Sequence, residues 1–242
     1  MDPTPPVPSP NLFSLAGQNV LITGATRGMF SFSRVAFLLP GPGIGAACAI
    51  ALAEAGASIC LVQRPLESGK SPNIETLNAI RALGASAEVV YCDLGDLQAA
   101  QQVFQKALQV MQGQIHTLVN CAGIQRRSPS LDFPESDWDD VLLNQPQCNT
   151  LKFNSDPSQV LNVNLKAVWL LSQAAGRHMV PLRRGKIINF CSLLTFQGGS
   201  TVPAYAAAKG ALGQLTKALS NEWSQHNVQV NAICPGYIAT DM

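Results

Sequence analysis

The sequence contains few charged residues and almost no excess of either sign. Lys and Arg total 16 and Asp and Glu total 15 among 242 residues, so the formal net charge is +1. Without a basic excess, or a basic patch interleaved with aromatics, the composition argues against binding to nucleic acid or to an anionic membrane. Charged residues make up 13% of the chain and hydrophobic residues 47%. This balance suits one large, well-buried α/β domain.

Paired cysteines, clustered histidines and long apolar runs are also missing. The seven cysteines form no C-x-x-C pair, so we expect thiols in a reducing compartment rather than disulfides. The three histidines are scattered, which argues against a metal site. No apolar run is long enough to span a bilayer. Residues 1–14 hold five prolines and resemble neither a secretion signal nor a transit peptide. We therefore expect a cytoplasmic protein with a disordered tail over residues 1–14.

Strand-like and helix-like runs alternate from residue 15 onward. Such alternation predicts parallel strands joined by right-handed helical crossovers, hence a doubly wound α/β sheet in a single domain over residues 15–242. The expected strands are 19–23, 57–63, 87–92, 115–120, 186–191 and 228–233. The expected helices are 46–55, 74–83, 97–111, 163–178 and 204–225.

Tyr205 and Lys209 stand four residues apart in one of these helices, and Ser192 follows the preceding strand. Residues at this spacing share a helix face. A free tyrosine has a pKa near ~10, and a neighbouring cation favours the phenolate and lowers that value. Such a tyrosine can serve as a general acid/base. The alternative is a half-buried aromatic beside a solvated cation, and the pair alone does not separate the two.

Two glycine-rich segments flank the first expected helix. Thr23 to Gly28 forms a turn after the first strand, and Gly43-Ile44-Gly45 opens the helix. Glycines allow backbone to approach a pyrophosphate, and a helix N-terminus offers free N–H groups. An ordinary strand-to-helix turn is the alternative.

Polar residues end two further strands. Asp93 follows the third strand, where a carboxylate can accept from an adenine amino group; the alternative is a helix N-cap. Asn120 ends the fourth strand and can tie neighbouring strands together. Ala122 and Gly123 after it are small enough for a cofactor to lie against the backbone, although an ordinary turn would look the same.

Taken in order, these motifs resemble short-chain dehydrogenases/reductases over about residues 15–242. The matching positions are Thr23-Gly-x-x-x-Gly28, Asp93, Asn120-x-Ala-Gly123, Asn164, Ser192, Tyr205-x-x-x-Lys209 and Pro235-Gly236. The resemblance implies a Rossmann-like domain that uses NAD(P)(H) to interconvert a secondary alcohol and a ketone on a small molecule, typically as a homotetramer. It implies no metal.

The resemblance also assigns roles to individual residues. Tyr205 would be the general acid/base, and Lys209 would lower its pKa and hold the nicotinamide ribose. Ser192 would orient the substrate oxygen, and Asn164 would hold a water in the proton relay. The implied cofactor contacts, beside Tyr205 and Lys209, are Thr23, Gly24, Arg27, Gly28, Ile44, Gly45, Arg64, Asp93, Leu94, Asn120, Ala122, Gly123, Pro235, Gly236, Ile238 and Thr240.

Within the family, the runs 122–127, 137–141, 193–199 and 235–240 resemble sugar-acid enzymes. These are the 2-deoxy-D-gluconate 3-dehydrogenase, 2-dehydro-3-deoxy-gluconate 5-dehydrogenase and gluconate 5-dehydrogenase group. The expected substrate residues are Arg126, Arg127 and Gln197. A guanidinium can bind a carboxylate bidentately, although two solvated loop arginines are the alternative.

The choice of dinucleotide is read just after the second strand. Folds that prefer NAD place an acid there for the ribose 2′-OH, whereas a basic residue suits a 2′-phosphate. Gln63 is not acidic and Arg64 is basic, which favours NADP(H). The sugar-acid resemblance favours NAD instead.

Two stretches, 29–43 and 142–160, interrupt the family motifs, and removing each makes the motif continuous. We interpret them as translated introns or an aberrant splice form, which sequencing of the mature transcript would test. The first would separate the glycine turn from its helix and impair cofactor binding. The sequence also stops at Met242, before the last strand of the family, which normally helps to form the tetramer. We therefore expect the homotetramer to be doubtful for this chain. The alternative function is therefore a catalytically inactive relative, or a mis-spliced product with a binding role or none.

Overall fold

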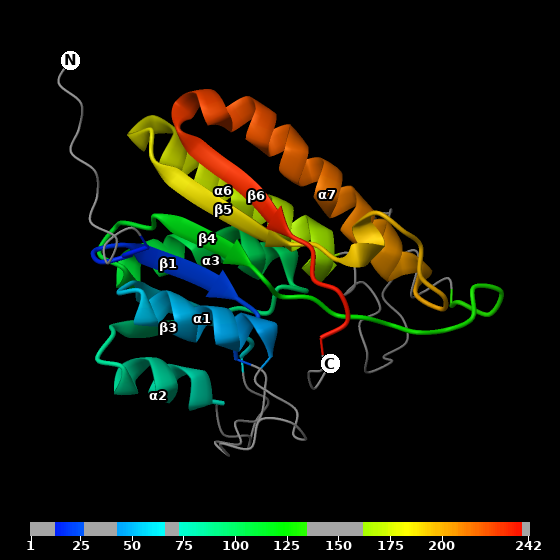
Figure 1. Cartoon of the computed structure of the whole chain (residues 1–242), viewed down its shortest axis with the longest axis horizontal. Helices are drawn as coiled ribbons and strands as arrows, with labels where there is room; N and C mark the ends of the chain where they lie inside the picture. Colours follow the sequence, from blue (N-terminus) through cyan, green and yellow to red (C-terminus); the bar gives the residue numbers. More distant parts are fainter. Residues whose placement is uncertain (1–12, 27–42, 66–72, 135–161, 239–242) are drawn as a thin grey trace.

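The computed structural model describes residues 13–26, 43–65, 73–134 and 162–238. In these residues a parallel six-stranded sheet runs in the order β3-β2-β1-β4-β5-β6 (Figure 1). The strands are β1 (Asn19–Thr23), β2 (Ser58–Gln63), β3 (Ala87–Tyr91), β4 (Thr117–Asn120), β5 (Gly185–Phe190) and β6 (Val228–Ile233). The predicted Rossmann-like doubly wound sheet is confirmed.

Helices cover both faces of this sheet. The first core cluster packs α3 (Leu97–Val110), α6 (Ala167–Leu182) and α7 (Pro203–Trp223) against one face. The second packs α1 (Ile44–Glu54) and α2 (Glu75–Ala82) against the other. Alanines at the inner positions of α1, such as Ala46 and Ala49, let this helix lie close to the strands.

The strand order reverses beside β1, which pairs with both β2 and β4. In such sheets ligands bind outside the carboxyl ends of the strands at this reversal. Thr23 ends β1 opposite Asn120 of β4, which in turn lies opposite Asn189 of β5. The Thr23 hydroxyl accepts the amides of Cys121 and Ala122, each at 3.1 Å, and so fixes the loop that leaves β4.

A chain of buried polar side chains links the middle of the sheet to α7. Asn120 donates to the side-chain oxygen of Asn189 at 2.9 Å and to the Ser172 hydroxyl at 3.3 Å. Asn189 donates to the Thr216 hydroxyl, which donates to the Leu212 carbonyl. The prediction that Asn120 ties neighbouring strands is confirmed.

The largest difference in element bounds lies around residue 163. The expected helix 163–178 begins as a single π-helical turn, Asn162–Lys166, and continues as α6 to Leu182. It continues past the expected end at residue 178 although Pro181 lies in its last turn, and Arg183 then leaves the helix in a left-handed conformation. Two short 3₁₀ turns, η3 (Leu193–Thr195) and η4 (Ser224–His226), flank α7.

Several sequence predictions fall on positions outside the described residues. These positions are 1–12 of the expected tail, 29–42 and 142–160 of the two interruptions, and Arg27, Gly28 and Thr240. Within the described ranges, no helix is long and apolar enough to cross a membrane. The cysteines described there, at 48, 60, 92, 121, 191 and 234, are all free thiols.

Candidate active site

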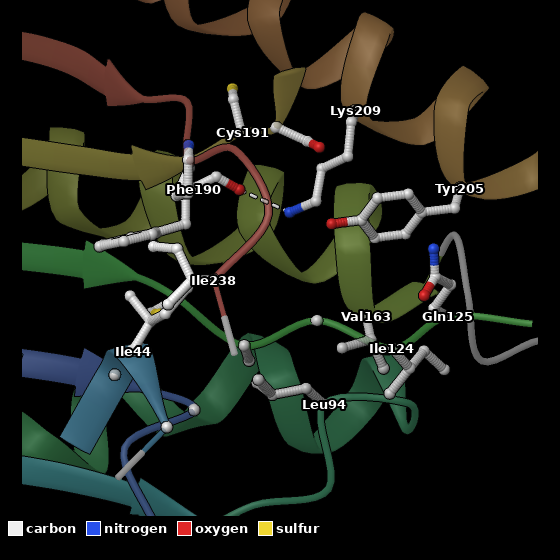
Figure 2. A pocket seen from close by; sticks show the side chains of 18 of the residues that line it. Ile44, Leu94, Ile124, Gln125, Val163, Phe190, Cys191, Tyr205, Lys209 and Ile238 are labelled. Atoms are coloured by element: carbon white, nitrogen blue, oxygen red, sulfur yellow. Dashed lines mark hydrogen bonds between the residues drawn. The ribbon is translucent and has the colours of Figure 1, made fainter. Parts of the chain in front are cut away.

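A cavity of about 420 Å³ lies beyond the carboxyl ends of the strands. Its walls come from the turn after β1, the start of α1, the ends of β2, β4 and β5, the first turns of α7, and residues 235–238 (Figure 2). Segments distant in sequence therefore meet around one space. That space lies at the reversal of strand order, where a doubly wound sheet binds its ligand.

The glycine turn and the first helix meet at one end of the cavity. Gly24 has a φ of +72°, and a Cβ there would lie 2.6 Å from the backbone of Ala122. A Cβ on Gly45 would overlap the carbonyl oxygen of Gly24. Among the described residues no side chain caps α1, which begins after Gly43. Backbone N–H groups at that helix end can thus meet an anionic group.

This arrangement corrects one expectation about the first interruption. We expected residues 29–43 to separate the glycine turn from the helix. Instead Gly24 and Gly45 are in backbone contact, and both line the cavity. The turn and the helix start are therefore in contact, and we call Gly24 and Gly45 the cradle. The expected impairment of cofactor binding stays a prediction.

Ser192, Tyr205 and Lys209 line the opposite part of the same cavity. Pro203 opens α7, as expected for a residue with a fixed φ and no N–H to satisfy, and Tyr205 follows within the first turn. The Lys209 ammonium lies 5.6 Å from the centre of the Tyr205 ring. Figure 2 shows the Tyr205 hydroxyl and the Lys209 ammonium directed into the same part of the pocket.

Lys209 is nearly fully buried, and its ammonium donates to the backbone carbonyl of Phe190. Burial lowers the pKa of Lys209 below its usual value, because desolvation disfavours the charged form. The carbonyl at the end of β5 compensates part of that cost and fixes the direction of the side chain.

Burial also raises the pKa of Tyr205, while a hydrogen bond with the Ser192 side chain acts in the opposite direction. The predicted lowering of this pKa by Lys209 stays a prediction. The nearby thiol of Cys121 has a pKa raised to about 12, mainly by burial, so at neutral pH it is uncharged.

Asn164 is bound by its side chain to the loop after β4. It is fully buried, its amide donates to the Ile124 carbonyl at 2.8 Å, and its oxygen accepts the Ile124 amide at 2.9 Å. Both ends of the side chain thus fix the loop after β4, and the water-holding role of Asn164 stays a prediction. A Cβ on Gly123 would lie 3.2 Å from the Asn164 oxygen.

Arg64 and Asp93 form an ion pair at the cradle end, with 3.3 Å between Nε and Oδ2. Asp93 also accepts the Gly95 amide at 2.9 Å. The alternative that Asp93 caps the next helix is wrong, because Asp96 accepts from Gln98 and Ala99 at the start of α3. Asp93 therefore stays at the cavity wall together with Leu94.

The two candidate arginines separate in the structure. Arg127 lines the cavity, whereas Arg126 and Gln197 are absent from its described walls. Arg127 donates to the Gln125 side-chain oxygen, and Arg126 to the Gln125 carbonyl, each at 3.4 Å.

Most of the other predicted positions meet at the cavity. The lining includes Gly24, Ile44, Gly45, Arg64, Asp93, Leu94, Ala122, Gly123, Pro235, Gly236 and Ile238. Thr23, Asn120 and Asn164 lie behind the described walls and support them through the hydrogen bonds given above.

Sequence reasoning missed several lining residues, including Gln125, Ile124, Val163 and Phe190. Ile124 and Gln125 directly follow the Ala122-Gly123 motif, so their place in the sequence could have indicated that they line the cavity. Phe190 contributes a backbone carbonyl, for which the side-chain pattern carries no signal. In the described part of the chain no group of three or more His, Cys, Asp or Glu residues could hold a metal.

Comparisons with known proteins agree with this geometry. A profile of the short chain dehydrogenase family matches residues 40–242. The 2-dehydro-3-deoxy-D-gluconate 5-dehydrogenase of Pseudoalteromonas atlantica is 40% identical over 229 residues, which cover 95% of this chain and 75% of that protein. The 5-keto-D-gluconate 5-reductase of Escherichia coli K12 is 38% identical over 234 residues, covering 96% and 76%.

A solved structure is similar as well. The gluconate 5-dehydrogenase of Burkholderia cenocepacia, in complex with NADP and tartrate, superposes with a TM-score of 0.72 at 32% identity and covers 94% of this chain and 74% of that one. Family profile, relatives and fold agree over nearly the whole chain. The protein therefore belongs to the short-chain dehydrogenase family.

Proposed function

We propose that this chain, an NAD(P)-dependent oxidoreductase, interconverts a secondary alcohol and a ketone on a sugar acid. The observation that carries the proposal is the single cavity. It joins the Gly24–Gly45 cradle at one end to Ser192, Tyr205 and Lys209 at the other. One space of this kind can hold a dinucleotide with its reactive end beside a proton-transfer group.

The nicotinamide, when bound, supplies or accepts the hydride. Tyr205 gives a proton to the carbonyl oxygen during reduction and takes it back during oxidation. The Ser192 hydroxyl holds that oxygen and bonds to Tyr205, which offsets part of the effect of burial on the tyrosine. Lys209, whose ammonium is fixed by the Phe190 carbonyl, would hold the nicotinamide ribose.

The remaining lining residues would hold the dinucleotide. Gly24 and Gly45 would approach the pyrophosphate, and Asp93 and Leu94 would contact the adenine. Ala122 and Gly123 would contact the ribose, and residues 235–238 would line the nicotinamide end. Support comes from the presence of all these segments in the walls of one cavity.

The direct test is turnover by the full chain. We expect it to reduce 5-keto-gluconate with NAD(P)H, or to oxidise the C5 hydroxyl of 2-dehydro-3-deoxy-gluconate with NAD(P)+, and not to convert the corresponding neutral sugars. Both directions are followed through the absorbance of the reduced nicotinamide. The proposal is wrong if no sugar acid is converted in either direction with either dinucleotide. That outcome would favour the catalytically inactive alternative.

Arg127 is proposed to bind the substrate carboxylate, because it reaches the cavity wall beside Gln125. Replacing Arg127 by Ala should raise KM for the sugar acid about tenfold or more, the usual size of a lost charge-assisted hydrogen bond. Steady-state kinetics measures this. Arg126→Ala is the matched control, since Arg126 is not among the described lining residues, and equal effects of both variants would contradict the assignment.

We also propose that the chain prefers NADP(H). Arg64 lines the cradle end with a side chain that is 46% exposed, so its guanidinium can meet a 2′-phosphate. Gln63 is buried, and its amide donates to the Asn73 carbonyl at 3.2 Å. The similar Burkholderia enzyme carries NADP.

Replacing Arg64 by Gln should weaken NADPH binding about tenfold or more, because one charge-assisted contact to the 2′-phosphate is lost. NADH affinity should change little, since NADH lacks that phosphate. Calorimetric titration with both dinucleotides measures the two values. A parallel loss for NADH and NADPH would show that Arg64 does not select the cofactor.

Assembly is a separate proposal. The homotetramer is typical of the family but doubtful for this chain, and we propose light scattering on the purified protein as the test of whether the tetramer forms. A monomeric mass would rule out the tetramer without touching the catalytic proposal.

A further inference from the structure

Thr195 lies where the two catalytic elements meet. Ser192 ends the extended segment after β5 and caps the short turn η3, with its hydroxyl accepting the Leu194 amide at 3.2 Å. Thr195 closes that turn, and its hydroxyl accepts the Ser192 amide at 3.2 Å. The capping box thus fixes the backbone of the residue that faces Tyr205.

The same hydroxyl also reaches helix α7. It donates to the backbone carbonyl of Lys209 at 2.9 Å. A threonine hydroxyl can donate one hydrogen bond and accept others through its lone pairs. Thr195 therefore connects the Ser192 amide to the Lys209 carbonyl through a single oxygen atom. Ser192 comes from the loop after β5, whereas Lys209 and Tyr205 come from α7.

The helix leaves room for this contact. Gly213 follows Lys209 by one turn of α7 and is buried, and a Cβ on it would lie 2.5 Å from the Thr195 methyl group. Gly210, on the same helix, has no heavy atom within 4 Å of such a Cβ. Of these two glycines, only Gly213 must lack a side chain to leave room for Thr195.

We propose that Thr195 is a positioning residue, whose hydroxyl holds Ser192 in register with Tyr205 and Lys209. It touches neither substrate nor cofactor, and the inference rests on the proposed function of those three residues. Small displacements of catalytic groups have large kinetic effects, since an error of about 1 Å can cost about 10²-fold in rate.

Thr195 also acts on the proton-transfer step through Ser192. The Ser192 side chain lowers the pKa of Tyr205, opposing the larger effect of burial. If Ser192 shifts away, that pKa rises. In the oxidation direction Tyr205 is the base, so the rise of kcat with pH would move to higher pH. In the reduction direction Tyr205 is the acid, so the fall of kcat would also move to higher pH.

The first experiment compares Thr195→Val with Thr195→Ser. Valine keeps the shape and removes the hydroxyl, whereas serine keeps the hydroxyl and removes the methyl group. We expect Thr195→Val to lower kcat by about 10- to 100-fold, move the pH profile upward and leave the dinucleotide KM within about twofold. Thr195→Ser should retain kcat within about threefold, because its hydroxyl can make both hydrogen bonds.

The second experiment approaches the contact from the helix side. Gly213→Ala should push Thr195 away and reproduce the lower kcat and the shifted pH profile. Gly210→Ala is the matched control, because it makes the same change of residue on α7 in open space and should leave both unchanged. Agreement between Thr195→Val and Gly213→Ala would be difficult to explain by a general loss of stability.

The outcomes separate this inference from the proposed function. If the wild-type chain turns over sugar acids and Thr195→Val matches it in kcat and pH profile, the positioning role is overturned. Equal losses in Thr195→Val and Thr195→Ser that follow their thermal unfolding would overturn it too. If the wild-type chain is inactive, the proposed function fails. Amide exchange then decides, because Thr195→Val must speed exchange at Ser192 while Thr195→Ser does not.

Discussion

Replacing Tyr205 by Phe should lower kcat by about 10²- to 10⁴-fold, the usual contribution of a positioned general acid/base. Only the hydroxyl is removed, so the packing of the ring near Lys209 is kept. Dinucleotide affinity should therefore stay within about twofold, and the loss should appear in kcat rather than in binding. Steady-state kinetics together with a dinucleotide titration measures both quantities.

Tyr91→Phe is the control for this variant. Tyr91 is half-exposed at the end of β3 and is not among the described residues of the cavity wall, so its hydroxyl has no proposed part in the reaction. The Tyr205 assignment would have to be abandoned if Tyr205→Phe kept more than a tenth of wild-type kcat with an unchanged pH profile. Ser192 would then be the remaining candidate for proton transfer.

Replacing Gly45 by Ala should abolish dinucleotide binding, with a loss of at least about 100-fold in affinity. The added Cβ would overlap the Gly24 carbonyl, and this contact is backbone, so no flexible side chain can move aside. The glycine turn and the start of α1 must then separate, which removes the N–H groups that would meet the pyrophosphate. Fluorescence titration with NADPH measures the loss.

Gly210→Ala again serves as the control, because it adds a Cβ in open space. Far-ultraviolet circular dichroism should show that both variants keep the fold. Unchanged affinity in Gly45→Ala would mean that the cradle is not formed by Gly24 and Gly45, and the proposed position of the dinucleotide would be wrong.

The fold could be predicted from the sequence because the apolar runs are short, regular and separated by glycine. The bounds of β1 and β6 are those expected, and other elements differ by a few residues. The exception is the start of α6, where a π-helical turn precedes the α-helix. Such a turn depends on the packing of Asn164 against the loop after β4, which the local pattern does not contain.

The site could be predicted in outline, because its side chains lie at strand ends and on one helix face. What could not be predicted are contacts to backbone groups. The Lys209 ammonium turns to the Phe190 carbonyl, and Asn164 pairs with both backbone groups of Ile124. Any residue presents the same carbonyl and amide, so the sequence has no signal for these partners.

The contact across the first interruption, residues 29–43, also has no signal in the sequence. From the sequence, residues 29–43 separate two halves of a phosphate-binding motif, and loss of the cradle was the natural expectation. The entropic cost of closing a loop increases only slowly with its length. The contact between Gly24 and Gly45 comes from the packing of α1 on the sheet. Tertiary packing, not sequence continuity, brings these two glycines together.

The central claim is that one cavity brings a dinucleotide to Ser192, Tyr205 and Lys209. A single-turnover experiment tests it most directly, with the full chain first saturated with NADPH and then mixed with 5-keto-gluconate. The account predicts saturable NADPH binding, followed by loss of reduced-nicotinamide absorbance in wild type but not in Tyr205→Phe. Absence of NADPH and NADH binding, or equal loss of absorbance in wild type and Tyr205→Phe, would contradict it.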